Sequence, residues 1–204
     1  MSIKNIVFDI GNVLVDFRWY DYMLDLGFTE EEASFLGENM VLNPLWGEFD
    51  RGARTDRSVI DEFKQRMPEY AALIEEFHRD PTDIVAFREG ADKWVKSYRE
   101  RGFRIYLLSN YPERLFSLNS KHFKFTQHID GALISYQIKH IKPEPEIFSA
   151  LFERFSLVPE ECIFIDDSEK NIEGAKKAGM HGVVYTSREQ AIEDVEKIIN
   201  SQNR

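Results

Sequence analysis

Cysteine is nearly absent from the chain: Cys162 is the only one among 204 residues. A single cysteine excludes an internal disulfide and fits a reducing compartment. The sequence also lacks any apolar run near the roughly 18 residues that a membrane-spanning helix needs, and it shows no amino-terminal signal segment. We therefore expect a cytoplasmic protein with no membrane partner.

Basic residues are in the minority, since 26 Lys and Arg stand against 36 Asp and Glu and the formal net charge is −10. Nucleic-acid affinity comes from neutralising phosphates with basic side chains, so this balance argues against a nucleic-acid partner. No repeats or low-complexity tracts are visible. What is present is 43% hydrophobic residues, with 16 Phe and 8 Tyr, which is typical of a globular protein with a well-supplied core.

The chain is organised around residues 3–17, reading IKNIVFDIGNVLVDF. The apolar run at residues 6–8 ends on Asp9, and Gly11 and Asn12 then favour a turn. Such a run predicts a strand buried on both faces of a parallel sheet. Open parallel sheets bind ligands beyond the carboxyl ends of their strands, so Asp9 is expected to face a cleft. Alone, this pattern is more often a strand-ending Asp that caps a turn.

Residues 18–83 contain no strong β-type pattern and predict helices. Their expected positions are 19–26, a helix starting at Thr29, 55–67 and 69–77. Residues 46–52, reading WGEFDRG, are expected to form a loop between helices. Its two aromatic residues are explained either by packing between helices or by contact with a substrate.

From residue 90 onward helices and strands alternate. The expected helices are 91–101, 113–122, one starting at Pro145, one capped by Ser168, and 187–200; the expected strands are 104–108, 132–134, 163–165 and 182–185. The stretch from residue 135 to Lys142 is expected to be irregular. Alternation of this kind predicts an α/β fold with a doubly wound parallel sheet. Residues 1–15 and 86–204 would form this Rossmann-like core, and residues 16–85 a small helical cap inserted after the first strand.

Polar side chains follow three of the predicted strands: Asp9, Ser109 with Asn110, and Asp166 with Asp167. Lys142 lies before the helix that starts at Pro145. Each of these alone is as well explained by a turn or by a solvated surface. Together they place three carboxylates and one ammonium at one edge of the sheet. Clustered carboxylates repel one another unless a cation lies among them, and oxygen ligands at this spacing suit Mg²⁺.

In this order, the segments FDIGNV, LLSN, IKPEPEIF and FIDDSEKNIEGAKKAG resemble the four motifs of the haloacid dehalogenase superfamily of phosphohydrolases. The resemblance spans the whole predicted core, with residues 16–85 in the place of the family's smaller cap. The first motif carries Gly11 where most members carry a second Asp. In this respect the chain looks most like the glucose-1-phosphatase-like branch near the phosphatase domain of epoxide hydrolases.

The resemblance implies a role for each matching residue. Asp9 would be the nucleophile that forms an aspartyl-phosphate, and at its ordinary pKa near 3.9 it is ionised at neutral pH. Ser109 and the Asn110 backbone would bind phosphate, and Lys142 would pair with both phosphate and Asp9. Mg²⁺ would be held by Asp9, Asp167, the main-chain carbonyl of Gly11, and Asp166 directly or through water, with Asn171 in support.

Gly11 departs from the family pattern. In most relatives an Asp there protonates the leaving oxygen and then activates water, and general acid–base catalysis is worth about 10²–10⁴-fold. Asp16, acting through water, or a cap residue could replace it; Asp16 is equally explained as a hinge residue. Two alternatives stay open: a binding or regulatory protein with weak or no catalysis, and a dehalogenase-like hydrolase. A signalling receiver domain is disfavoured because its acid pair precedes the phosphorylated Asp.

We expect an Mg²⁺-dependent phosphatase of small phosphomonoesters, sugar phosphates in particular. In the cap, Trp19, Trp46, Phe49 and Arg51 are candidates for substrate contact, with Arg51 binding phosphate. The physiological substrate and the oligomeric state are not predicted.

Overall fold

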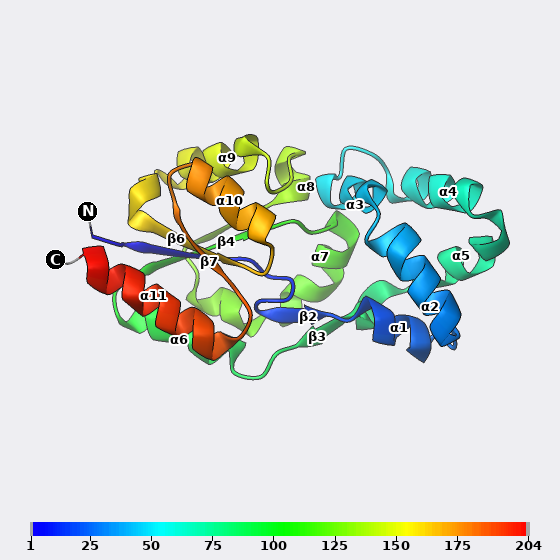
Figure 1. Ribbon diagram of the computed structural model, residues 1–204, viewed down its shortest axis with the longest axis horizontal. Helices are drawn as coiled ribbons and strands as arrows, with labels where there is room; N and C mark the ends of the chain where they lie inside the picture. The colour runs from blue at the N-terminus through cyan, green and yellow to red at the C-terminus, as the bar shows by residue number, and fades with distance from the viewer. Residues whose placement is uncertain (1, 203–204) are drawn as a thin grey trace.

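Five parallel strands form the central sheet of the computed structural model, which describes residues 2–202 (Figure 1). In spatial order they are β5 (Gly131–Ile134), β4 (Arg104–Ser109), β1 (Asn5–Phe8), β6 (Cys162–Asp166) and β7 (His181–Val184). β1 lies between β4 and β6, and all four of its residues are buried. The continuous apolar run that precedes Asp9 is therefore the central strand of the sheet, as its composition predicts.

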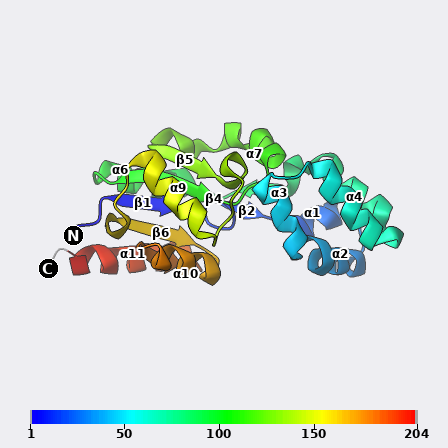
Figure 2. The same cartoon turned by 90° about the horizontal axis from the view of Figure 1, so that it is seen from above.

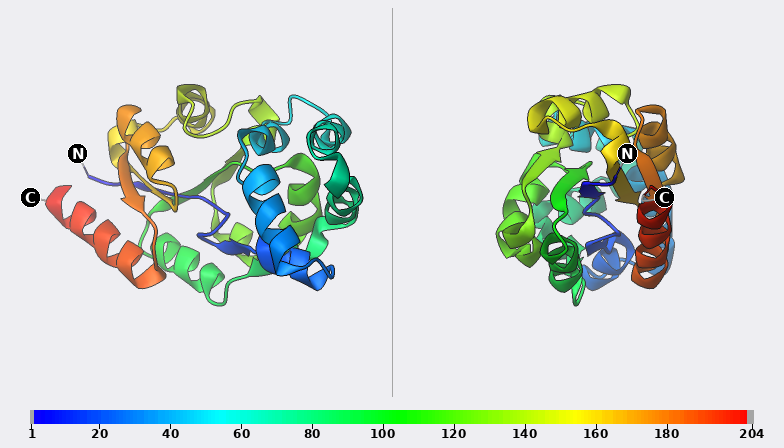
Figure 3. Two further views of the ribbon diagram at one scale, coloured as in Figure 1. Left: turned by 45° about the vertical axis from the view of Figure 1, so that its right-hand side comes forward. Right: turned by 90° about the vertical axis from the view of Figure 1, so that its left-hand side faces the viewer.

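Helices cover both faces of this sheet (Figure 3). Ile6 and Phe8 of β1 pack in one apolar cluster with α6 (Ala91–Glu100) and α11 (Arg188–Gln202). Val7 points to the other face and packs in a second cluster with α9 (Pro145–Phe155) and α10 (Glu169–Lys177). Successive side chains of a strand point to opposite faces, so one short strand contributes to both clusters. The predicted doubly wound α/β fold is confirmed.

A helical segment is inserted after β1 and lies beyond one end of the sheet (Figure 1, Figure 2). Two short antiparallel strands, β2 (Val15–Phe17) and β3 (Val85–Phe87), lead into and out of it. We call residues 18–84 the cap. Its α-helices are α1 (Trp19–Asp25), α2 (Glu30–Leu36), α3 (Gly47–Arg51), α4 (Asp56–Arg66) and α5 (Ala71–Arg79), with a π-helical turn at Gly37–Val41 and 3₁₀ turns at Pro44–Trp46, Pro68–Tyr70 and Pro81–Ile84.

Local sequence signals account for several helix ends. Thr29 caps α2, since its hydroxyl accepts from the Glu32 N–H at 3.2 Å while the Glu32 carboxylate accepts from the Thr29 N–H at 2.8 Å. Pro145 begins α9, as predicted. Ser168 occupies the position before α10, but its side chain makes no capping bond there. Ser168 is thus the N-cap residue, as predicted, but without a side-chain cap, and its N–H donates to Asp166 Oδ1 at 2.8 Å.

Two segments expected to be irregular are helical. Residues 46–52 contain α3, and the stretch after β5 forms α8 (Ser135–Ile138). These very short helices contact each other across the boundary between cap and core: the Ser135 hydroxyl donates to the Asp50 carbonyl at 2.5 Å, and Lys139 Nζ donates to the Gly52 carbonyl at 2.5 Å. Their structure depends on tertiary contact, which periodicity over four or five residues does not reveal.

The remaining helical pieces are α7 (Glu113–Asn119) and 3₁₀ turns at Ser120–His122, Lys124–His128 and Pro159–Glu161. Across residues 2–202, no helix combines the length and the apolar character needed to cross a bilayer.

Candidate active site

The carboxyl ends of β1, β4 and β6 meet at the edge of the sheet that faces the cap (Figure 1). Asp9 follows β1, Ser109 ends β4 and Asp166 ends β6. Lys142 reaches the same point from the loop before α9. All four side chains are buried, although three of them are charged residues that are seldom fully buried unless they are paired. Parallel strands bring Asp9, Ser109 and Asp166 together because their carboxyl ends share one edge, and the loop before α9 adds Lys142.

Lys142 joins the two buried carboxylates. Its ammonium lies 2.9 Å from Asp9 Oδ1 and 2.6 Å from Asp166 Oδ2. Asn110 fixes the backbone of the lysine, because its side-chain oxygen accepts the Lys142 N–H at 2.7 Å and its side-chain nitrogen donates to the Lys142 carbonyl at 3.1 Å. The Asn110 side chain therefore positions Lys142.

Burial shapes the ionisation of this cluster. It raises the pKa of Asp9 to about 7, because desolvation outweighs the lowering effect of the Lys142 ammonium and the Asp166 charge adds to the rise. Burial therefore works against the ionised form of Asp9, while the Lys142 ammonium at 2.9 Å works for it, and the ionised nucleophile stays a prediction. For Lys142, burial opposes the charged form, yet the carboxylates of Asp166 and Asp9 raise its pKa above the ordinary value.

Three carboxylates fit a divalent cation here. Asp9, Asp166 and Asp167 each offer an oxygen within 4.8 Å of the others, against the single Lys142 ammonium. Asp166 already accepts four hydrogen bonds, from Lys142, the Ser168 N–H and Asn171 Nδ2 at both oxygens, which fills the capacity of a carboxylate. Asp9 and Asp167 are thus the carboxylates with oxygens available to a metal.

Asn12 links Asp167 to the base of the cap. Its side-chain nitrogen donates to Asp167 Oδ2 at 3.0 Å, and its side-chain oxygen accepts the Phe17 N–H at 3.2 Å. Asn12 adopts a positive φ of 54°, which Asn tolerates better than most residues. Sequence analysis treated it only as a turn residue, and nothing in the sequence pairs it with Asp167.

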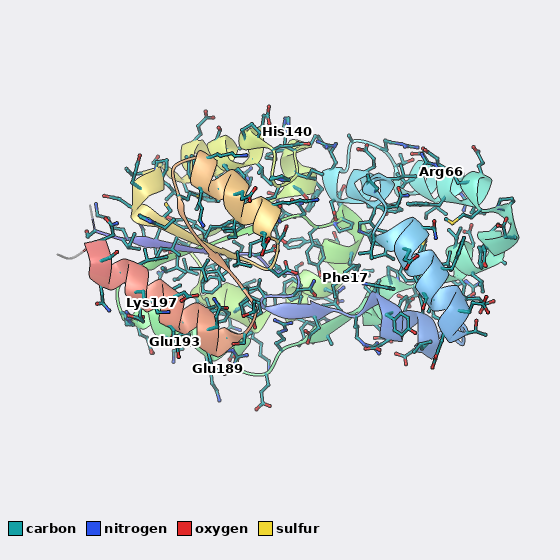
Figure 4. All side chains as sticks on the ribbon, in the orientation of Figure 1. Phe17, Arg66, His140, Glu189, Glu193 and Lys197 are labelled. Carbon is teal, nitrogen blue, oxygen red and sulfur yellow. The ribbon has the colours of Figure 1, made fainter. Side chains whose placement is uncertain are left out.

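A cavity of about 160 Å³ lies over the cluster, between core and cap. Phe17, labelled in Figure 4 at the junction of the two parts, is one of its walls. The core contributes mostly polar groups, the strands β2 and β3 contribute apolar side chains, and the cap contributes one aromatic residue and one carboxylate. The lining residues are Asp9, Gly11, Asn12, Asn110, Tyr111, Pro112, Leu115 and Asp167, with Val15, Phe17, Trp46, Asp50 and Val85.

Of the four candidates for substrate contact in the cap, only Trp46 lines this cavity. Phe49 is buried against Trp46, with ring centroids 5.2 Å apart, and Trp19 packs inside the cap against Tyr20. The Arg51 guanidinium is bound by Glu144, at 2.6 and 2.9 Å. The structure thus does not bring Arg51 to the phosphate end of the site, and its contact ties the cap to the core.

Asp16 also lies outside the cavity lining. Its carboxylate pairs with Arg88, whose guanidinium nitrogens lie 2.6 and 2.7 Å away, and Arg88 donates in addition to the Asn12 carbonyl at 2.6 Å. Asp16 belongs to β2, so this ion pair braces the strands that lead into the cap. The structure favours the hinge interpretation of Asp16.

Sequence reasoning missed one carboxylate of the cavity, that of Asp50 in α3. It receives no hydrogen bond and makes no ion pair within residues 2–202. Burial raises its pKa to about 7, with Lys142 opposing the rise and the charge of Asp9 adding to it. In the sequence, nothing distinguishes Asp50 from its neighbour Glu48, because the docking of α3 decides which of the two lines the cavity.

Comparison with known proteins identifies the family. A haloacid dehalogenase-like hydrolase family model matches residues 3–179. The chain belongs to this family. It is 25% identical over 189 residues to D-ribitol-5-phosphate phosphatase of Bacteroides thetaiotaomicron, covering 87% of this chain and 89% of that one. It is also 32% identical to mouse bifunctional epoxide hydrolase 2, but over only 39% of this chain and 14% of that protein.

A solved structure of a haloacid dehalogenase family enzyme from B. thetaiotaomicron, in complex with magnesium and inorganic phosphate, has a TM-score of 0.72 at 25% identity and covers 92% of this chain and 96% of that one. The predicted family, its fold and the assignment as a phosphatase of this family are confirmed. The individual roles predicted for Asp9, Ser109, Lys142, Gly11, Asp166 and Asp167 stay predictions.

Proposed function

We propose that this protein is a cytoplasmic, Mg²⁺-dependent phosphatase that hydrolyses small phosphomonoesters, sugar phosphates in particular, through an aspartyl-phosphate on Asp9. The observation that carries the proposal is the buried bridge of Lys142 between Asp9 and Asp166, with Asp167 beside it and a cavity above. This arrangement supplies a nucleophile, a fixed positive charge and free carboxylate oxygens at one point.

The residues divide the work as follows. Lys142 holds Asp9 through Oδ1 and neutralises part of the charge of an incoming phosphate. Ser109 and the backbone after β4 donate to phosphate oxygens. Asp9, Asp167 and the Gly11 carbonyl would hold Mg²⁺, with Asp166 acting through water because its lone pairs are already used. The bound metal would offset the carboxylate charge, keep Asp9 ionised and polarise the phosphoryl group.

The size and lining of the cavity favour a small polar ester. A cavity of about 160 Å³ between cap and core is compatible with a small metabolite. One relative that spans most of the chain is a D-ribitol-5-phosphate phosphatase, which supports the sugar-phosphate class without naming the substrate.

The test is phosphate release from a panel of metabolite phosphoesters, with Mg²⁺ and with EDTA. We expect release that requires Mg²⁺, and its loss in Asp167→Ala, which lacks a carboxylate that is free to bind metal. No release from any ester would favour a binding or regulatory protein. Normal hydrolysis by Asp167→Ala in EDTA would refute the metal assignment.

A further inference from the structure

Gly11 leaves the site without the acid that most relatives carry, and neither packing nor backbone conformation requires a glycine there. A Cβ atom at this position would meet no atom within 4 Å, and the φ of Gly11 is not in the left-handed region. Gly11 also lines the cavity. Packing therefore does not require the glycine, and because glycine has no side chain, the proton transfers of the proposed reaction need another group in the same cavity.

Asp50 is the one carboxylate of the cavity lining that lies outside the Lys142 and metal cluster. The competing acids are engaged: Asp166 accepts four hydrogen bonds, Asp167 is bonded to Asn12 and belongs to the metal cluster, and Asp16 is paired with Arg88 outside the lining. No donor within residues 2–202 satisfies the Asp50 carboxylate. It is therefore free to exchange a proton with a ligand.

The backbone of Asp50 is fixed to the core. Ser135 of α8 donates its hydroxyl to the Asp50 carbonyl at 2.5 Å and accepts the Tyr111 N–H at 3.0 Å. Tyr111 lies two residues after Ser109, so one serine connects Asp50 to the strand end that carries the predicted phosphate contact. The flanking residue Arg51 is bound to Glu144 at 2.6 Å, which holds the same turn of α3 against the core.

Tyr111 lines the same cavity of about 160 Å³ as Asp50 and Asp9. Burial raises the pKa of its phenol, and the charges of Asp9 and Asp50 both add to the rise. Its hydroxyl is buried and has no hydrogen-bond partner among the described residues.

We propose, on the basis of the phosphatase function above, that Asp50 is the catalytic acid and base of this enzyme, supplied by the cap in place of the carboxylate that Gly11 does not provide. A purely substrate-binding carboxylate is the competing explanation, and the experiment below separates the two.

In the proposed reaction Asp50 gives up a proton in one step and takes one back in a second step. In the first, an Asp9 oxygen bonds to phosphorus, the bond from phosphorus to the ester oxygen breaks, and protonated Asp50 gives its proton to that oxygen, which leaves as an alcohol. In the second, water attacks phosphorus while ionised Asp50 takes its proton, and the bond from phosphorus to Asp9 breaks. Inorganic phosphate leaves, and Asp50 is protonated again for the next substrate.

The local charge favours the protonated form of Asp50 that the first step needs. A phosphate dianion entering beside Asp50 disfavours a further negative charge and so favours the protonated acid for the first step. With an unliganded pKa of about 7, Asp50 exchanges protons readily near neutral pH. After the alcohol leaves, the carboxylate remains facing the phosphoryl group on Asp9.

The test compares Asp50→Asn, Asp50→Asn with Gly11→Asp, and the matched control Glu48→Gln on the same helix, which removes a carboxylate that does not line the cavity. With sugar phosphates, we expect Asp50→Asn to lower kcat about 10²–10⁴-fold with a smaller change in KM. With nitrophenyl phosphate, whose leaving group needs little protonation, the variant should give a burst of nitrophenol followed by slow turnover. Glu48→Gln should stay within about twofold of the unmodified enzyme.

Rescue distinguishes an acid–base role from a structural one. Gly11→Asp in the Asp50→Asn background should raise kcat at least about tenfold, because it places a carboxylate on the core side of the same cavity. Three results would each overturn the assignment. Asp50→Asn could leave kcat unchanged, it could change KM alone, or it could lower activity equally with both substrates and without rescue by Gly11→Asp. Asp9→Asn separates a failure of the Asp50 assignment from a failure of the proposed phosphatase function. If Asp9→Asn is inactive while Asp50→Asn keeps full activity, only the Asp50 assignment fails. If the unmodified enzyme releases no phosphate, both fail.

Discussion

On the core side of the cavity the charged groups are bonded to one another, whereas on the cap side the carboxylate of Asp50 has no hydrogen-bond or ion-pair partner within residues 2–202. Asp9, Lys142 and Asp166 form one buried ionic unit, and Asn110 and Asn171 fix its members. Asp50 has no such partners within the described part of the chain. Hydrogen bonds and ion pairs hold Asp9, Lys142 and Asp166 in one geometry. Asp50, which we propose to gain and lose a proton during the reaction, is not held in this way.

The two sides also differ in how they are attached. Strands of the central sheet carry the core residues, but the cap meets the core through the short β2–β3 pair and through partly exposed contacts such as that between Arg51 and Glu144. Exposed ion pairs are worth at most about 1 kcal/mol each. Changes on the cap side should therefore alter catalysis or substrate choice while leaving the core folded.

The largest effect is expected from the core nucleophile. Asp9→Asn should lower phosphate release by about 10⁴-fold or more, because an amide cannot form the phosphoryl intermediate. The measurement is phosphate release by purified variant, with circular dichroism to confirm the fold. Activity above about a hundredth of the unmodified enzyme would assign the nucleophile to another residue.

Lys142→Met should destabilise the metal-free protein by about 3–5 kcal/mol, since it leaves the buried carboxylates of Asp9 and Asp166 without a positive partner. Urea unfolding in EDTA measures the loss. Addition of Mg²⁺ should recover part of it, because the metal then offsets the same charges. A loss below about 1 kcal/mol would show that the bridge is not the buried ionic unit described above.

The cap holds a buried histidine neutral. Burial lowers the pKa of His78 to about 4, and its Nδ1 lies 2.8 Å from the Ile74 carbonyl. The unfolded chain binds a proton near the ordinary pKa of 6.5, so between about pH 6.5 and 4 it binds more protons than the folded chain and stability falls as pH falls. This histidine alone should cost about 2 kcal/mol between pH 7 and pH 5.

The check is the free energy of unfolding across that pH range for the unmodified protein and for His78→Gln. Asp9 and the other carboxylates titrate in both, so the difference in slope isolates His78. If the free energy of unfolding changes with pH equally in the two proteins, His78 takes up a proton in the folded cap as readily as in the unfolded chain.

The smallest effect is expected at the contact between cap and core. Arg51→Met should cost less than about 1 kcal/mol, because both partners of its ion pair with Glu144 are partly exposed. Yet it should lower kcat, since α3 carries Asp50 and loses one of its fixed points. Urea unfolding and steady-state kinetics on the same preparation test the two halves of this prediction. A large loss of stability with unchanged kcat would show that the contact between Arg51 and Glu144 stabilises the fold and does not position Asp50.

The sequence predicts the core side of the site better than the cap side. Asp9, Ser109, Lys142 and Asp166 could be predicted because each lies at the end of a strand or in a recognisable motif, and parallel strands bring such ends together. Asp50 could not, because its place depends on α3 docking against α8, and both helices are too short to show a period. The β2–β3 pair was missed for the same reason, since strands of three residues carry no alternation. Arg51 was expected at phosphate, but its charge is matched by Glu144, which is distant in sequence.

We propose that Asp9 of the core forms the bond to phosphorus and that Asp50 of the cap activates the water that breaks it. Rapid quenching of the reaction with nitrophenyl phosphate, followed by mass spectrometry of the peptide that contains Asp9, measures this directly. We predict that Asp50→Asn accumulates a phosphoryl group on Asp9 during turnover, that the unmodified enzyme and Glu48→Gln accumulate far less, and that Asp9→Asn accumulates none. A phosphoryl group on another residue, or slow turnover by Asp50→Asn without accumulation on Asp9, would contradict the account.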